Sequence, residues 1–385
     1  MRFFLLITTL LITCAFSATS AAKALLEIDV HYLTQRHKSD KHLPVLQRSP
    51  ANLGLAGLQL AIADSNTTGK FLGYHYNLQT HIIDTIEDLQ TVLEQLDHAA
   101  IVHHLDDALT TSLYEQTAKQ PFILFNAGNY SANLRSHACG DNIFHTAPSD
   151  AQLTDALGQW LLKKQLTKVF LITGTQAEDQ SYIKALERTF KRFRINVIAR
   201  KAWTFDMDLR RSIQQDIPLF TQTSRPYDAV VVADPSQVFG YYIPYNTFYP
   251  RPVVGTEGLI ADSWHPAIEQ WGARQLQGRF VDTAQRLMQA QDYNHYIAVR
   301  AIAQGVQTIG TLDIPKLTQY LRSEAFSLAA YKGRKLSFRS DSGQLRAPIP
   351  LFHARGLVSQ SPQEGFMHPV TELDTLGLTS NEVCQ

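Results

Sequence analysis

The strongest constraint on the fold is a regular alternation of short apolar segments with amphipathic helical segments. In the first part of the chain, strands are expected at 26–33, 73–83, 99–102 and 121–125, with helices at 53–64, 85–96 and 106–119. After Pro148, strands are expected at 168–172, 195–202 and 227–233, with helices at 151–165, 178–193 and 209–223. Such alternation is typical of parallel sheets covered on both faces by helices. The sequence therefore predicts an α/β fold with two doubly wound parallel-sheet lobes.

The last third of the chain does not form a third run of this kind. It contains one further strand at 252–255, long helices at 275–290 and 293–308, and two strands around Asp341-Ser342-Gly343. We expect these pieces to return to the existing lobes. The predicted first lobe is 23–148 plus 252–330, and the second is 149–251 plus 331–385 with the C-terminal tail. Several crossings between two lobes make a hinge.

The N-terminal segment reads as a secretory signal peptide over residues 1–22. Arg2 gives a positive start, 3–16 is almost wholly apolar, and small residues precede a cleavage point after Ala22. A lipoprotein signal with Cys14 as the acceptor is the alternative. No later segment approaches the ~20 apolar residues that a membrane-spanning helix needs. The mature protein is therefore expected in the periplasm.

Charge and motifs argue against several classes of function. Lys and Arg number 35 and Asp and Glu number 35, whereas nucleic-acid binders usually carry a basic excess. The phosphate-binding loop, the serine nucleophile elbow and the His-Glu-x-x-His zinc helix are all missing from the sequence. We expect neither an enzyme nor a bound cofactor, and no nucleic-acid partner.

Ligands of doubly wound folds bind beyond the carboxyl ends of the strands, so polar and aromatic groups at those positions are the candidate ligand-binding residues. They are His103, His104, Asp106, Asn126, Ala127, Gly128, Tyr182, Asp234, Glu257 and Trp264. Each has a structural alternative: helix capping for Asp106, a plain turn for 126–128 and for Asp234, and packing for Tyr182 and Trp264. A metal site at His103-His104 is a further alternative. Adjacent strand residues point to opposite faces, however, so the two rings cannot easily share one ion.

Two segments resemble type I periplasmic binding proteins, the leucine/isoleucine/valine-binding group. Residues 53–73, with Gly57, Ala61 and the run Asn66-Thr67-Thr68-Gly69-Lys70-Phe71-Leu72-Gly73, are similar to the family's opening helix and turn. Residues 333–338 with Gly343 are similar to its late hairpin. The resemblance spans essentially the whole mature chain. It implies a monomeric substrate-binding component that delivers a small molecule or ion to an ABC transporter permease in the inner membrane.

Three further segments resemble a narrower branch of that group. Residues 271–277, 331–339 and 361–369 are similar to substrate-binding proteins found with alcohol oxidation systems that depend on pyrroloquinoline quinone (PQQ). This resemblance implies a periplasmic solute of quinoprotein metabolism.

The resemblance also implies roles for some residues. The loop from Asn126 to Gly128 resembles the one that faces a ligand carboxylate, Tyr182 the second-lobe tyrosine, and Glu257 the acid that meets an ammonium group. The family's first-lobe serine has no counterpart, because His103-His104-Leu105-Asp106 stands there. Histidines and carboxylates suit a cation or a metal complex better than a free carboxylate. A periplasmic metal-binding chaperone and a sensory protein of the same fold are the alternatives to transport.

Two cysteines, Cys139 and Cys384, remain after the signal segment with Cys14 is removed. In an oxidising compartment the pair suggests one disulfide, and two separate thiols are the alternative. Thiol labelling of the unreduced mature protein is expected to find no free cysteine. Labelling of two thiols per chain would refute the bridge.

Overall fold

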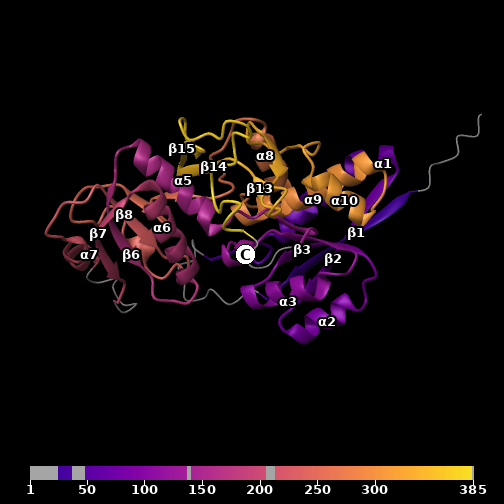
Figure 1. The fold of residues 1–385 in the computed structure, drawn as a ribbon, viewed down its shortest axis with the longest axis horizontal. Coiled ribbons are helices and arrows are strands. Elements are labelled where there is room, and N and C mark those ends of the chain that lie inside the picture. Colours follow the sequence, from indigo (N-terminus) through magenta and orange to yellow (C-terminus); the bar gives the residue numbers. More distant parts are fainter. Residues whose placement is uncertain (1–24, 37–47, 137–139, 205–212, 384–385) are drawn as a thin grey trace, which may run out of the picture.

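The computed structural model describes residues 25–36, 48–136, 140–204 and 213–383 (Figure 1). The expected signal peptide, Cys139 and Cys384 lie outside the described residues. Among the helices of the described ranges, none has the length and apolar character needed to cross a membrane.

The first lobe is built on a five-stranded parallel sheet in the order β2-β1-β3-β4-β5. The strands are β1 (Leu26–Thr34), β2 (Tyr74–Ile82), β3 (Ala99–His104), β4 (Phe122–Asn126) and β5 (Ile143–His145). The helices are α1 (Leu55–Leu72), α2 (Ile86–Leu93), α3 (Asp107–Thr117), α4 (Asn133–Ser136), α8 (Ala273–Ala284), α9 (Ala290–Ile309) and α10 (Ile314–Arg322). The expected parallel α/β lobe is confirmed.

The second lobe is built on a seven-stranded mixed sheet in the order β15-β14-β10-β9-β8-β6-β7. The strands are β6 (Lys168–Thr173), β7 (Asn196–Ala202), β8 (Ala229–Ala233), β9 (Val253–Gly255), β10 (Leu259–Ala261), β14 (Ile349–His353) and β15 (Gly356–Ser361). Its helices are α5 (Asp150–Lys163), α6 (Asp179–Phe193), α7 (Ile213–Thr221) and the short η3 (Gly240–Tyr242). Among the described strands of this sheet, the pairs β10–β14 and β14–β15 are antiparallel.

The chain crosses between the lobes three times. It enters the second lobe after β5, returns between β10 and α8, and crosses again before β14. The structure thus places β9 and β10 in the second sheet, although the sequence pattern assigned 252–330 to the first lobe. Conversely, β11 (Leu328–Ala329), β12 (Lys335–Phe338) and β13 (Leu345–Arg346) form a small sheet on the core of the first lobe. Strands of two to four residues are too short to show a period, so their sheet could not be assigned from sequence.

Local sequence explains where the elements begin. The first five residues of β3 are buried and apolar or histidine, as expected for a central parallel strand. The α5 helix begins directly after the first crossing with a capping box, in which the Ser149 hydroxyl accepts from the Gln152 N–H. Figure 1 shows the two lobes side by side, with β14 and β15 of the second sheet labelled near α5.

The C-terminal tail is fastened to the second lobe by one buried acid. Asp155 on α5 is fully buried and pairs with Arg188 at 3.0 Å and with Arg192 at 2.5 Å. The same carboxylate accepts from the N–H of Gly377 at 2.9 Å. On the other side, Arg339 of the first lobe donates to the carbonyls of Leu376 and Leu378. The tail therefore contacts both lobes.

Replacing Asp155 is expected to destabilise this junction. Asp155→Ala leaves two arginines without their shared buried acid, which should cost about 3 kcal/mol of unfolding free energy. Asp97→Ala, at an exposed position, is the matched control and should change the unfolding free energy by less than about 0.5 kcal/mol. Urea denaturation measures both. Equal midpoints for the two variants would contradict the role given to Asp155.

Candidate ligand-binding cleft

The candidate site lies where the carboxyl ends of the two parallel sheets carry their loops. In the first lobe these loops follow β3 and β4, and in the second they follow β6, β8 and β9. Because the strands of each parallel set point the same way, the loops of each lobe gather at one edge of its sheet.

The two histidines that end β3 point in different directions. His103 is fully buried, and its Nε2 lies 3.2 Å from the hydroxyl of Tyr114 on α3. Burial lowers the pKa of His103 to about 3, so the ring is neutral. His104 is half-buried, and its ring lies 5.9 Å from the ring of His295. No group of three or more metal-ligating side chains occurs in the parts of the chain that the structure describes.

His295 on α9 also lies beside the carboxyl edge of the first sheet, although the sequence pattern did not predict it. The centroid of its ring lies 5.2 Å from that of Tyr32, and the two rings meet edge to face. The ring also covers Gly54, where an added Cβ would lie 2.9 Å from it. Its Nδ1 lies 2.7 Å from the carbonyl oxygen of Gln291, so this nitrogen carries the proton. Its Nε2 is buried and has no hydrogen-bond partner among the described residues. Nothing in an isolated His within a helix pattern signals this position.

The loop after β4 is held by the side chain of Asn126. Its Oδ1 accepts from the N–H of Gly128 at 3.3 Å and of Asn129 at 2.9 Å. Its Nδ2 donates to the carbonyl of Asn129 at 2.8 Å. Ala127 donates its N–H to the carbonyl of His103. The ring of His104 covers Gly128 so closely that an added Cβ would lie 2.2 Å from it. Asn126, Ala127 and Gly128 are all buried, so this loop is a packed turn.

Arg135 is a second residue that sequence reasoning missed. It is 2% exposed, and it donates to the carbonyls of Asn129, Ser131 and Ala147 and to the side chain of Gln344. These bonds tie the loop after β4 to the first crossing between the lobes. A single Arg in a short polar segment carries no pattern that would identify it.

On the second lobe, Asp234 fills the turn that follows β8. Its carboxylate accepts from the N–H groups of Val238, Phe239 and Gly240 at 3.0, 2.8 and 2.6 Å. Asp179, at the start of α6, accepts in the same way from the N–H groups of Gln176 and Ser236. Both carboxylates are buried.

Glu257, after β9, is placed differently from these two acids. It is half-buried, and its side chain lies against Gly240. Burial, together with the negative charge of Asp234, raises the pKa of Glu257 to about 7, while the N–H of Gly258 acts in the opposite direction. A positive charge near Glu257 would therefore stabilise the ionised form of its carboxyl group.

A polar network joins the two lobes. Tyr130 donates to Asp262 at 3.2 Å and receives a hydrogen bond from Asn294 at 3.3 Å. Ser181 donates to Asp150 at 2.6 Å. Burial raises the pKa of both Asp150 and Asp262 to about 6.

The remaining predicted residues lie as follows. Tyr182 is buried in the second lobe, and the charges of Asp150 and Asp262 add to the effect of burial in raising its pKa. Trp264 is buried and stacks on Tyr293 at 4.8 Å. Asp106 is exposed and caps α3 through the N–H of Leu109.

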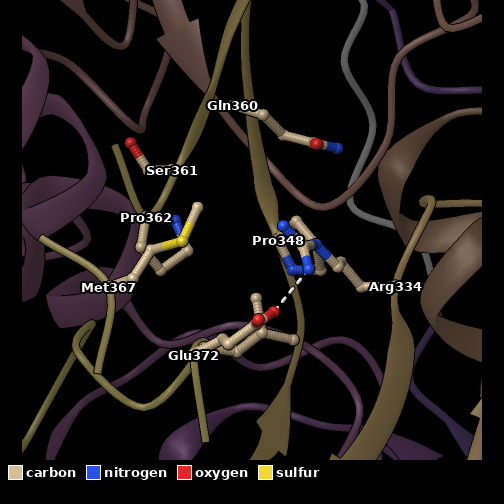
Figure 2. A pocket seen from close by; sticks show the side chains of 8 residues that line it. Arg334, Pro348, Gln360, Ser361, Pro362, Met367 and Glu372 are labelled. Atoms are coloured by element: carbon tan, nitrogen blue, oxygen red, sulfur yellow. Dashed lines mark hydrogen bonds and ion pairs between the residues drawn. The ribbon is translucent and has the colours of Figure 1, made fainter. Parts of the chain in front are cut away.

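A small cavity of about 120 Å³ lies apart from these loops. Figure 2 shows its lining by Pro348, Gln360 and Met367, with Arg334 paired to Glu372. It is formed by β15 and the segment that follows it, and contains none of the predicted ligand-binding residues.

Comparison with known families finds a match over part of the chain. Residues 48–208 match the family described as "Periplasmic binding protein". A comparison with curated proteins finds no match.

Solved structures share the fold over most of the chain. A branched chain amino acid ABC transporter periplasmic ligand-binding protein from Burkholderia xenovorans is 16% identical, with a TM-score of 0.67, over 86% of this chain and 95% of its own. A leucine-, isoleucine-, valine-, threonine- and alanine-binding protein from Brucella ovis, in the closed conformation, is 12% identical with a TM-score of 0.66 over 94% and 97%. A solute binding protein from R. palustris in complex with benzoate is 14% identical with a TM-score of 0.64 over 86% and 95%.

The contact between His104 and Gly128 gives a prediction that can be tested by a double mutant. Gly128→Ala forces the ring of His104 aside and should lower the unfolding free energy by about 1–3 kcal/mol. Combining it with His104→Ala removes the ring atoms that lie 2.2 Å from the added Cβ, although the Cβ of residue 104 stays at 2.7 Å. Because part of the clash is relieved, the unfolding free energy lost in the double variant should be less than the sum of the two single losses. Gly278→Ala is the control, because an added Cβ there meets nothing within 4 Å. Strict additivity would show that the contact does not exist.

Proposed function

We propose that this chain, a member of the periplasmic binding protein family with that family's two-lobe fold, is the receptor for a small organic solute and delivers it to an ABC transporter permease. The ligand is held between the carboxyl edges of the two sheets, and the lobes close on it. The family supports a periplasmic location, and the proposed role requires no chemical transformation of the ligand.

The observation that carries this proposal is the arrangement of the crossings. Three segments join the lobes, and the polar network of Tyr130, Asp262 and Asn294 lies among them. We propose that loops from both sheets face the same interlobe space. A ligand that contacts both edges stabilises the closed form preferentially, which is how a receptor of this kind signals occupancy.

Among the predicted residues, His104 and Glu257 are proposed to contact the ligand. Both are half-buried side chains at the carboxyl edges, one in each lobe. His103, Asn126, Ala127, Gly128 and Asp234 are proposed to support the shape of the edges, because they are buried and engaged with neighbouring groups. Tyr182 and Trp264 are proposed to support the walls in the same way, and Asp106 to fix the start of α3.

The narrower assignment to PQQ-dependent alcohol oxidation systems remains a prediction. It rests on the resemblance of residues 271–277, 331–339 and 361–369 alone. A solute screen that includes alcohols and their oxidation products tests it.

Small-angle scattering tests the receptor proposal. The mature protein is screened by thermal shift against a library of amines, amino acids, carboxylic acids, amides, alcohols and sugars, and each stabilising solute is then taken to scattering. A true ligand is expected to raise the midpoint of unfolding and to reduce the radius of gyration, because closure makes the molecule more compact. If no solute in the library produced both effects, the proposal would fail.

A further inference from the structure

The class of ligand follows from which hydrogen-bond donors the cleft has available. A carboxylate is held in proteins by backbone N–H groups or by cationic side chains. An acid or an α-amino acid bound here therefore needs such donors at the carboxyl edges. The contacts of the described residues show where those donors point.

In the first lobe, the backbone donors of the loop after β4 are already engaged. The N–H groups of Gly128 and Asn129 point at the side-chain oxygen of Asn126, and that of Ala127 points at the carbonyl of His103. The N–H of Asp106, in the loop after β3, donates to Gln35 at 2.7 Å. The ring of His104 covers Gly128 as well. A ligand carboxylate at this loop would have to displace an internal hydrogen bond for each one it gained.

In the second lobe, the protein's own acids occupy the donors. The N–H groups of Val238, Phe239 and Gly240 converge on Asp234, which is the arrangement that elsewhere binds an anion. Those of Gln176 and Ser236 converge on Asp179. These two anion-binding turns are therefore filled by built-in carboxylates, and a second anion there would meet like charge.

The nearby cations are also committed to other groups. Arg135 is buried and donates to three carbonyls and to Gln344. Lys332 is 1% exposed, and its Nζ donates to the carbonyl of Pro348 at 2.9 Å. Arg286, near the start of α1, makes two hydrogen bonds to Asp292. Reaching a ligand would require any of them to leave these partners.

The acidic groups are more numerous in this region. They are Asp107, Asp150, Asp179, Asp234, Glu257 and Asp262. Asp107 is exposed and accepts hydrogen bonds from Asn129 and Ser131, and Asp262 is half-buried and accepts from Tyr130 and Ser263. Glu257 is half-buried, has the N–H of Gly258 as a partner, and adjoins Gly240, which two half-buried tyrosines follow in the chain. An organic cation prefers a carboxylate and aromatic faces as neighbours.

We propose that the cleft selects an organic ammonium ion without a carboxylate, with Glu257 as its counter-ion, and rejects acids and α-amino acids. This inference rests on the proposed receptor function and specifies the ligand class for the same cleft. It separates this chain from the relatives whose structures were solved with benzoate or leucine.

Matched ligand triplets test the inference by calorimetry at pH 7. One triplet is 3-methylbutylamine, leucine and 4-methylpentanoate. A second is 2-phenylethylamine, phenylalanine and 3-phenylpropanoate. Within each triplet the side group is constant, while the ammonium and carboxylate groups are present separately or together. At least one of the two amines is expected to bind ten-fold or more tightly than its amino acid and its acid.

The outcomes separate the inference from the receptor proposal. Tighter binding of an amino acid or an acid overturns the ligand class while leaving the receptor intact. Failure of both amines, alongside closure on a solute of the library that is not an amine, also overturns the ligand class and not the receptor. If no solute closes the protein, both the receptor proposal and the proposed ligand class are overturned.

A variant and a proton count add an independent readout. Glu257→Gln is expected to weaken amine binding ten-fold or more, whereas Glu115→Gln, at an exposed position on α3, should leave it unchanged.

The groups acting on Glu257 are Asp234, which raises its pKa, and the N–H of Gly258, which lowers it. With a pKa of about 7, Glu257 is about half protonated at pH 7, and a bound cation favours its ionised form. Amine binding should therefore release about half a proton, measured from the buffer dependence of the binding enthalpy. No release, with unchanged binding by Glu257→Gln, excludes Glu257 as the counter-ion.

Discussion

The structure of the cleft depends on one constraint, which is that backbone N–H groups at the ends of parallel strands must be satisfied. Proteins of this architecture commonly leave some of those donors for a ligand. Here Asn126 occupies them in the first lobe, and Asp179 and Asp234 occupy them in the second. The same bonds that make the loops rigid also remove the natural contacts for an anion. Stability of the edges and choice of ligand thus have a common origin.

The contacts between the lobes also depend on satisfying buried polar groups. Polar groups buried near the crossings are paired across elements, as with Tyr130 and Asp262, or with Arg135 and the carbonyl of Ala147. The tail after β15 adds contacts to both lobes through Asp155 and Arg339. Each of these bonds joins segments that are distant in the sequence. The proposed closure of the lobes on a ligand, as a rigid-body motion, would need no change inside either sheet.

Sequence alone predicted much of the fold but only part of the candidate site. The apolar strands and amphipathic helices up to residue 233 are long enough to show their periods, and the two predicted lobes are confirmed. The short strands β9 to β13 have no readable period, so their sheet membership needed the structure. Glu257 and His104 could be proposed as ligand contacts from sequence because they stand at or just after the ends of strands. His295 and Arg135 were not, because they reach the edge from helices on other parts of the chain, and only tertiary packing brings them there. The role of Asn126 was also beyond prediction, since sequence shows a donor-rich loop but not which partner its donors choose.

The most direct test of this account is a crystal structure of the mature protein grown with 2-phenylethylamine. The account predicts the ammonium group within hydrogen-bond distance of the Glu257 carboxylate, with the N–H groups of Gly128 and Gly240 still donating to Asn126 and Asp234. An ammonium group bound away from the Glu257 carboxylate in this crystal would contradict it, as would a leucine carboxylate seated on either of those N–H groups in a crystal grown with leucine.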